Sequence, residues 1–382
     1  MGDDLTKTIH KLLLPLFSMQ RASWEQGLFA QALLEYHIFR SEAVEPLEDT
    51  LDILPIIYGL VHDVIVRQGP DGRFGVVLNG DGGSDKSAVD PACIGEAVYF
   101  VYDWQGVDKT MLDIASRSML EYILNQCPKG FVDDHSPKVR ADEAYLYSHR
   151  VDATQVWSDS VYMLPSFLVS SAVFYSRHPN PIGNPVELLQ AGLSQIELAR
   201  GVLQSTSSRL WRHIYDFEER GATGSPLQDT LLRDPEIIDL LESCYQTLVE
   251  TLRACIKCMR HDGLFHNVLD DSTTFVETNL AQQLTYTIYR LLDLSHDKES
   301  KISRYLHFPA MEPEAMDKLL MVAGKMFEAC KGKVDRWGFV RDVCGSPTFD
   351  KPGTAAEGQA WAILMHVAKA RFERNQGRQS QG

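Results

Sequence analysis

The feature that most constrains the fold is a helical repeat of apolar residues that recurs through the chain. In residues 240–259, apolar side chains stand three and four positions apart, and the same spacing appears in residues 23–39, 280–291 and 316–330. This spacing places the apolar side chains on one face of an α-helix. Because such a helix cannot cover its apolar face alone, the pattern predicts helices that pack against one another.

Loops rich in glycine, aspartate and proline separate these helical segments, and no linker or low-complexity stretch divides the chain. The best strand candidate is FGVVLNG, residues 74–80. A regular alternation of helix and loop favours one all-α toroid or solenoid, since each helix pair needs neighbours to bury its apolar face. We therefore expect a single domain over residues 1–370 and a disordered tail over residues 371–382.

Charge and apolar content exclude some classes of partner. A net charge of -15 argues against nucleic acid and against an anionic membrane surface. The longest apolar stretch, residues 161–175, is interrupted by Pro165 and several serines, so it is too short to span a bilayer. The N-terminus shows no secretory signal, and the 7 cysteines follow no disulfide framework, which together predict a cytoplasmic protein with reduced thiols. The oligomeric state stays open.

The sequence contains no nucleotide, flavin or metal motif. NGDGGSDKS, residues 79–87, lacks the spacing of a P-loop or of a dinucleotide-binding turn. Cys255 and Cys258 form a C-x-x-C pair, but no second pair or suitably spaced histidines complete a zinc site, and both cysteines fit the helical repeat. We therefore expect no cofactor and no metal.

Two aspartates are candidate acid–base groups. Asp90 precedes Pro91, which suits the first turn of a helix, so Asp90 could be a helix N-cap or a functional carboxylate. Asp159 lies within the otherwise apolar run QVWSDSVYM, residues 155–163, where a charged carboxylate is costly unless it is paired, hydrogen-bonded or protonated. The alternative for Asp159 is a hydrogen-bonded core aspartate. Two such groups facing one cavity, one protonated and the other ionised, would suit acid–base catalysis.

Basic and aromatic residues nearby are candidates for substrate binding. His149 and Arg150 precede the second aspartate, and Arg150 could bind a carboxylate as a fork or form a surface ion pair. Trp211, Arg212 and His213 form a compact cluster. An aromatic face can stack on a sugar ring, and Arg with His suits a carboxylate, but the cluster could equally pack a helix end.

Several segments taken together resemble the six-hairpin glycosidases. In chain order they are RASWEQG, VDPACIGEAV, YSHRVDATQVWSDSVYMLPSFL, LWRHIYD, DGLFHNVLDDSTTFVETNLAQ and WGFVRDVCGSP, within residues 20–365. Within this group the chain is most similar to the unsaturated rhamnogalacturonyl and glucuronyl hydrolases of glycoside hydrolase families 105 and 88, particularly the fungal members. The W-x-D-x-x-Y-M and V-E-T-x-x-A-Q segments occur at matching places. The resemblance implies an (α/α)6 barrel of six helical hairpins with its site at one mouth.

The resemblance also implies a reaction. In that family an aspartate protonates the C4=C5 double bond of a terminal unsaturated uronic acid, water adds at C5, and the resulting hemiketal opens and expels the remaining sugar. Asp159 would be this acid and water activator, kept protonated by apolar surroundings, and Asp90 would be the second carboxylate. His149, Arg212 and His213 would surround the small-molecule or oligosaccharide substrate.

Three more residues are assigned to substrate binding, together with Arg150 and Trp211. Trp24, in RASWEQG, could line the mouth of a cavity, although it also fits the apolar stripe of its helix. Tyr162 would share a helix face with the catalytic aspartate. His266 lies in the matching segment DGLFHNVLDD.

One departure from the family pattern leaves alternatives open. The family carries a W-G-x-G-N-G-W segment after the part that matches LWRHIYD, whereas this chain has HIYDFEERGATGSPLQDTLLRDPEI, so the sugar-binding wall should be altered or open. One alternative is a barrel repurposed in fungal secondary-metabolite biosynthesis, which cyclises an apolar intermediate as a Diels–Alder-type cyclase or hydrates it. Another is a catalytically inactive binding protein. A polar, arginine-lined cavity would favour the uronate, and an aromatic and aliphatic one would favour the cyclase, because fold alone does not decide function.

Overall fold

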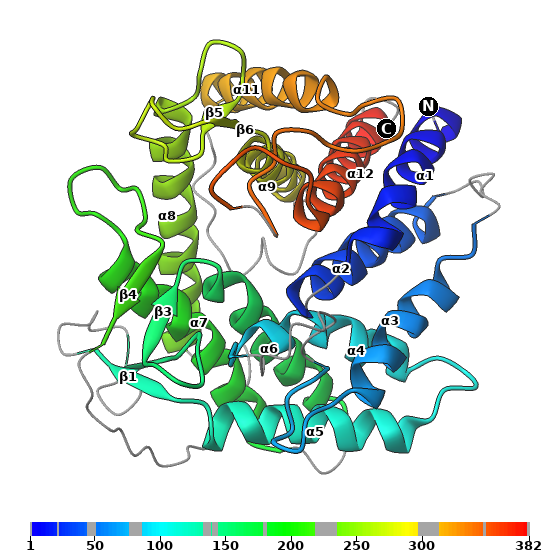
Figure 1. The fold of residues 1–382 in the computed structure, drawn as a ribbon, viewed down its shortest axis with the longest axis vertical. Coiled ribbons are helices and arrows are strands. Elements are labelled where there is room, and N and C mark those ends of the chain that lie inside the picture. Colours follow the sequence, from blue (N-terminus) through cyan, green and yellow to red (C-terminus); the bar gives the residue numbers. More distant parts are fainter. Residues whose placement is uncertain are drawn as a thin grey trace. The chain divides into compact units, whose positions relative to one another are not determined.

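The computed structural model describes residues 2–20, 23–43, 51–75, 86–132, 139, 144–178, 182–217, 235–296, 313–346 and 349–379. This part of the chain is predominantly helical, and its strands are short (Figure 1). The all-α class predicted from the apolar repeat is therefore confirmed. The strand predicted at residues 74–80 lies largely outside the described residues, and its two described positions, Phe74 and Gly75, are not in a strand.

The elements follow one another as helices with short strands between them. The helices up to residue 203 are α1 (Gly2–Met19), α2 (Ser23–Ser41), α3 (Leu54–Val66), the 3-10 helix η1 (Asp90–Ile94), α4 (Gly95–Tyr102), α5 (Lys109–Asn125), α6 (Ser160–Tyr175) and α7 (Pro185–Leu203). The later helices are α8 (Pro235–Lys257), α9 (Asn279–His296), α11 (Pro313–Lys331) and α12 (Ala356–Gln379). The strands pair antiparallel as β1 (Lys129–Phe131) with β2 (Tyr145–Tyr147), β3 (Gln155–Trp157) with β4 (Ile214–Asp216), and β5 (Phe265–His266) with β6 (Val276–Glu277).

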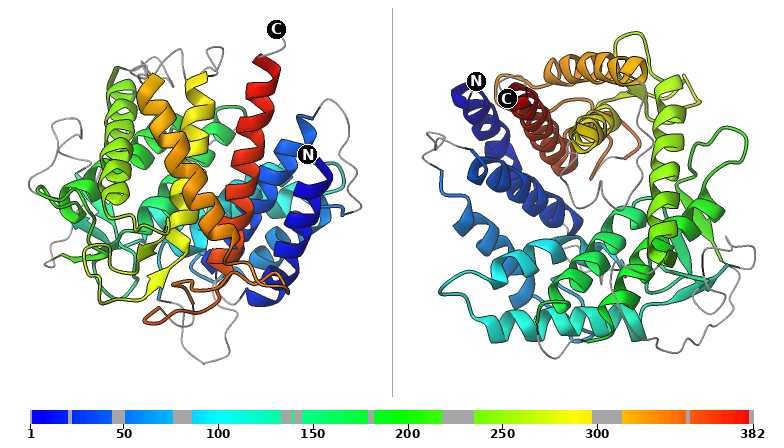
Figure 2. Two further views of the ribbon diagram at one scale, coloured as in Figure 1. Left: turned by 90° about the horizontal axis from the view of Figure 1, so that it is seen from above. Right: turned by 180° about the vertical axis from the view of Figure 1, so that it is seen from behind.

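Contacts within the chain group its residues into two compact units. The first comprises Met1–Gln20, Ala32–Leu54 and Cys255–Gly382, and the second comprises Arg21–Gln31 and Pro55–Ala254. In the first unit α9 packs against α11 and α12, and α12 packs against α1 (Figures 1 and 2). In the second unit α6 packs against α7, α4 and η1. A single domain over residues 1–370 stays a prediction.

Helix α6 is central to the second unit because its side chains are apolar on several faces. Leu164, Phe167 and Leu168 are all buried. The Phe167 ring stacks on that of Tyr99, with 6.0 Å between the ring centroids, and Gly95 leaves room for it because a Cβ at this position would collide with the Phe167 ring. Burial of this surface fixes where α6 begins, and with it the residues that immediately precede the helix.

The C-terminal helix corrects the predicted disordered tail. Helix α12 continues to Gln379, so most of the segment 371–382 is helical. Arg371 is buried and forms an ion pair with Glu35 at 3.2 Å, and Phe372 is buried as well. The prediction was wrong as far as Gln379, because the polar composition of the last residues conceals the buried contacts that hold the start of this segment.

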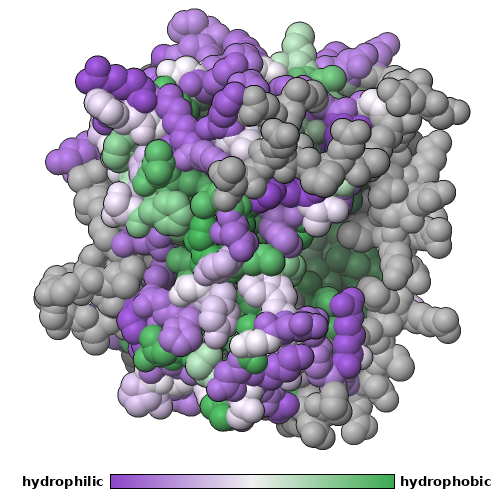
Figure 3. Space-filling view, turned by 90° about the vertical axis from the view of Figure 1, so that its right-hand side faces the viewer, coloured by the Kyte–Doolittle hydropathy of each residue, from purple (hydrophilic) through white to green (hydrophobic). Residues whose placement is uncertain are grey.

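Polar side chains cover much of the face drawn in Figure 3, and hydrophobic residues reach it in patches. Across the described ranges, no helix combines the length and the apolar character that crossing a membrane requires.

Candidate active site

Asp90, His149 and Asp159 come together in the second unit. The imidazole of His149 lies between the two carboxylates, with Nε2 at 3.7 Å from Oδ1 of Asp90 and Nδ1 at 3.7 Å from Oδ1 of Asp159. Asp90 begins η1, His149 follows β2, and Asp159 lies between β3 and α6. The fold therefore brings both predicted carboxylates and the predicted histidine into one cluster.

Asp90 is the buried carboxylate of the cluster. Its side chain is only 6% exposed. It is the first residue of η1, whose N-cap position is Val89, and no side chain caps this helix. The backbone N–H of Asp90 donates to Oγ of Ser87 at 3.0 Å. The N-cap interpretation of Asp90 is therefore wrong, and the structure places its carboxylate beside an imidazole instead.

Asp159 is the accessible carboxylate of the cluster. Its side chain is 41% exposed, and although Asp159 occupies the N-cap position of α6, its side chain makes no capping hydrogen bond. The expectation of an aspartate enclosed by apolar residues is therefore wrong, since Trp157 and Tyr162 are themselves only partly buried. The chain changes here from strand to helix, so the apolar residues that flank Asp159 in the sequence do not enclose it in space. Oδ1, which faces His149, is itself buried, so a ligand can reach the carboxylate only from the side of Oδ2.

Burial sets the charge of His149. Its side chain is as buried as that of Asp90, and this burial lowers the pKa of His149 to about 4, against the opposing effect of the Asp159 charge. The ring is therefore neutral at pH 7. Oγ of Ser160 lies 3.0 Å from Nδ1 of the ring. Nδ1 thus pairs with a hydroxyl group, while both carboxylates act on the neutral ring through their charge at 3.7 Å.

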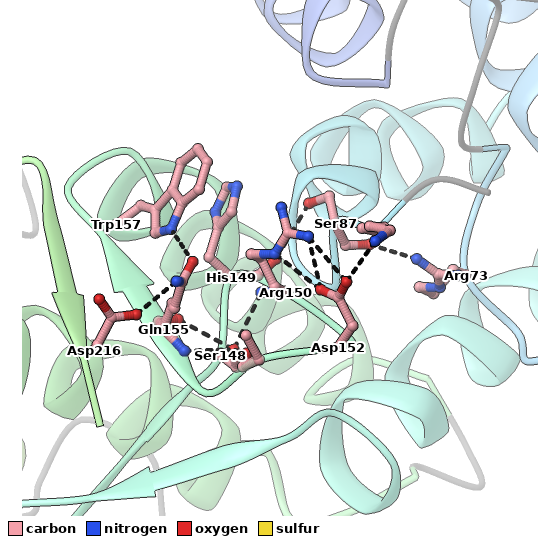
Figure 4. Close-up of polar contacts among 11 residues, drawn as sticks. Arg73, Ser87, Ser148, His149, Arg150, Asp152, Gln155, Trp157 and Asp216 are labelled. Carbon is pink, nitrogen blue, oxygen red and sulfur yellow. Dashed lines mark hydrogen bonds and ion pairs between the residues drawn. The ribbon is translucent and has the colours of Figure 1, made fainter. Parts of the chain in front are cut away.

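Trp157 belongs to the site, although the sequence analysis assigned it no role. Its indole stacks on the His149 ring, with 4.1 Å between the ring centroids and 10° between the planes (Figure 4). Its Nε1–H donates to Oε1 of Gln155 at 3.0 Å. A signal was present in the sequence, because Trp157 is the aromatic residue of the W-x-D motif that ends in Asp159.

The pairing of β3 with β4 brings one of the predicted basic residues, His213, next to Trp157. The backbone N–H of Ser158 donates to the carbonyl of His213 at 2.8 Å, and Oγ of Ser158 lies 3.1 Å from Nδ1 of His213. The His213 ring lies 5.3 Å from the Trp157 ring, measured between centroids. Arg212 precedes it and is exposed, and no carboxylate of the described residues pairs with its guanidinium.

Two other residues predicted to bind substrate form hydrogen bonds with side chains of the protein. Arg150 donates to both carboxylate oxygens of Asp152, at 2.9 and 3.0 Å, which is the surface ion pair that the sequence left open. Arg150 together with Lys86 lowers the pKa of Asp152 to about 2. Trp211 donates its Nε1–H to Thr251 of α8 at 3.0 Å. Substrate contact by Arg150 and Trp211 stays a prediction.

The remaining predicted residues lie in three places. Trp24 is partly buried in α2, and its carbonyl accepts from the thiol of Cys93 at 3.8 Å. The hydroxyl of Tyr162 donates to Gln31 of α2. His266 belongs to the first unit, where its Nδ1 lies 2.9 Å from the carbonyl of Thr274. Their contact with substrate is likewise still a prediction.

Two further expectations bear on what the site can hold. Searching the described residues finds no group of three or more His, Cys, Asp or Glu that could bind a metal ion. The loop that replaces the W-G-x-G-N-G-W segment falls mostly on residues 218–234, which lie outside the described residues.

Comparison with known proteins defines the fold. No family model matches the chain. No curated protein matches it either. A solved structure from Klebsiella pneumoniae, described as a possible member of the GH105 family, is 14% identical, with a TM-score of 0.66 over 98% of this chain and 94% of that one.

Two more solved structures are similar to the same extent. A possible member of the GH105 family from Salmonella enterica is 14% identical, with a TM-score of 0.65 over 98% of this chain and 95% of that one. A glycosyl hydrolase of family 88 from Bacteroides vulgatus is 12% identical, with a TM-score of 0.62 over 97% of this chain and 99% of that one.

These likenesses concern the fold, because identities of 12–14% carry no residue-level assignment. All three proteins come from bacteria, so the particular similarity to fungal members stays a prediction. The (α/α)6 barrel that the sequence segments indicated is confirmed. The chain therefore has the fold of the six-hairpin glycosidases, shared with structures of glycoside hydrolase families 105 and 88.

Proposed function

We propose that the protein hydrolyses unsaturated uronyl oligosaccharides, with Asp159 as general acid and base. The observation that carries the proposal is a neutral imidazole, His149, held 3.7 Å from each of two carboxylates. Asp159 faces the substrate, since its side chain is 41% exposed, whereas Asp90 is buried on the other side of the ring. The shared fold with structures of families 105 and 88 supports this substrate class.

The first step is proton transfer to carbon. When its carboxyl group carries a proton, Asp159 donates it to C4 of the C4=C5 bond, and the ring oxygen of the uronate stabilises the positive charge that develops at C5. The buried Asp90 carboxylate contributes negative charge near this cation. His149 lies 3.7 Å from each carboxylate, which is beyond hydrogen-bonding distance, so in this geometry the ring separates the two acidic groups.

The second step is hydration. Water adds to C5 while the Asp159 carboxylate accepts its proton, which returns the carboxyl group to its starting form. The hemiketal then opens by cleavage of the bond between C5 and the ring oxygen. The hemiacetal left at C1 releases the remaining sugar as an alcohol, so one water molecule is consumed and no other reactant is needed.

Arg212 and His213 would bind the carboxylate of the uronate. Both are exposed, the His213 ring lies beside Trp157, and a guanidinium can donate two parallel hydrogen bonds to a carboxylate. The charged and polar character of these residues supports an anionic sugar over an apolar intermediate.

An assay with an unsaturated uronyl disaccharide tests the proposal. We expect the purified protein to abolish the absorbance of the conjugated alkene. Asp159→Asn keeps the shape of the side chain but cannot donate the proton, so we expect kcat to fall by about 100- to 10,000-fold. Asp103→Asn changes an aspartate whose side chain is 75% exposed and should leave the rate unchanged. A wild-type protein that leaves the disaccharide intact, or an Asp159→Asn variant at full rate, would contradict the proposal.

A further inference from the structure

We infer that Gln155 and Asp216 are positioning residues of this site, which hold the indole of Trp157 flat against the imidazole of His149. The motifs of the sequence analysis assigned neither residue a role. The inference rests on the proposed function for its kinetic consequence. Its structural consequence, the environment of the His149 ring, can be measured without substrate.

The pairing of β3 with β4 builds this support. Gln155 stands opposite Asp216, and Trp157 stands opposite Ile214. Gln155 and Trp157 are two residues apart on one strand, so their side chains project from the same face. The Nε2–H of Gln155 donates to Oδ1 of Asp216 at 2.5 Å, while Oε1 of Gln155 accepts from the Trp157 indole at 3.0 Å. Figure 4 shows these side chains side by side, with the Trp157 indole next to the His149 ring.

Donor and acceptor chemistry allows only one arrangement of the hydrogen bonds between Asp216, Gln155 and Trp157. A carboxylate can only accept hydrogen bonds, and an indole N–H can only donate. The amide of Gln155 supplies one donor and one acceptor, so it satisfies both neighbours in a single orientation. A side chain at position 155 that lacks either function leaves Asp216 or Trp157 without this partner.

The backbone of Gln155 supports His149 independently of the side chain. The N–H of His149 donates to the carbonyl of Gln155 at 2.6 Å, and Oγ of Ser148 accepts from the N–H of Gln155 at 3.0 Å. A substitution at position 155 leaves these main-chain bonds in place. Its effect on the site therefore reports what the side chain does through Trp157.

The stacked indole controls how much water reaches His149. The other groups that face this ring are Asp90 from η1, Asp159 and Ser160 at the start of α6, and His213 before β4. Arg150, which follows His149 in the chain, also lowers the pKa of His149. Burial is the largest of these influences, so a Trp157 side chain that turns away would let water in and raise the pKa of His149.

A pair of variants separates the hydrogen bonds from the charge. Gln155→Glu keeps an acceptor for the indole, but it sets two carboxylates opposite each other and removes the donor to Asp216. Adding Asp216→Asn reverses the polarity of this bond, because the new amide donates to the new carboxylate. The double variant carries the same net charge as the wild type and restores both hydrogen bonds. Because the double variant also restores the net charge, a neutral variant, Gln155→Met, which removes both hydrogen bonds and adds no charge, must raise the His149 midpoint as well.

Two measurements on the full chain test the inference. The first is an NMR titration of the His149 ring in the free protein, with the signal assigned from its loss in His149→Asn. For Gln155→Glu we expect the midpoint to rise by about one pH unit and kcat on the unsaturated disaccharide to fall about tenfold. That change corresponds to about 1.4 kcal/mol, within the range of one typical intramolecular hydrogen bond. KM should change less, and the double variant should bring both values back to within about twofold of the wild type.

The possible outcomes are distinct. An unchanged His149 titration and an unchanged kcat in Gln155→Glu would overturn the inference. A double variant that recovers neither the titration midpoint nor kcat would also overturn it. The loss would then come from the added carboxylate or from a disturbed fold. If the wild type leaves the disaccharide intact, the proposed function fails, while the NMR titration still decides whether Gln155 and Asp216 position the ring.

Discussion

Because His149 is buried, we expect the free energy of unfolding to fall on acidification. Replacing His149 by a residue that does not titrate should abolish this part of the pH dependence. The pKa of an ordinary histidine is 6.5, and burial lowers the pKa of His149 to about 4. Between these two values the unfolded chain binds a proton that the folded chain does not bind. The free energy of unfolding must therefore fall as the pH falls from 6.5 to 4. A difference of 2.5 pH units corresponds to about 3 kcal/mol lost by pH 4.

Urea unfolding of the wild type and of His149→Gln at pH 7 and pH 4 measures this loss. The variant keeps a polar side chain but has no ring to titrate. We expect its free energy of unfolding to change by about 3 kcal/mol less between the two pH values than that of the wild type. His261→Gln removes an exposed histidine and should behave as the wild type does. Equal changes in the wild type and in His149→Gln would refute the reasoning that burial keeps this ring neutral.

Two further predictions concern binding and packing. Arg212→Ala should raise KM for the unsaturated disaccharide at least about tenfold with a smaller change in kcat, because it removes an exposed guanidinium that can bind the carboxylate as a fork; Arg212→Lys should recover part of the loss. An unchanged KM would remove Arg212 from the site. Phe167→Ala should lower the free energy of unfolding by about 3–5 kcal/mol in urea titrations, because this ring is 1% exposed and stacks on Tyr99. A loss below about 1 kcal/mol would show that the space left by the ring collapses.

The helices of this protein could be predicted from the sequence because a buried helix face leaves a direct trace in it. The apolar repeats over residues 23–39 and 240–259 correspond to α2 and α8, and the repeats at 280–291 and 316–330 lie within α9 and α11. A period near 3.6 residues arises only when one side of a helix is covered. Local spacing thus determined the fold class, and the order of the motif segments indicated the six-hairpin architecture.

The site depended on contacts that no local pattern contains. Asp159 sits among apolar residues in the sequence, yet its carboxylate is accessible because a strand ends and a helix begins there, whereas Asp90, which could have been a helix N-cap, is buried and caps no helix. The inferred positioning of Trp157 against His149 needs Gln155 and Asp216, which only the pairing of β3 with β4 brings together. Sequence spacing reports which neighbours a residue has along the chain. Burial, pKa and ring stacking depend on its neighbours in space, and packing of the elements decides those.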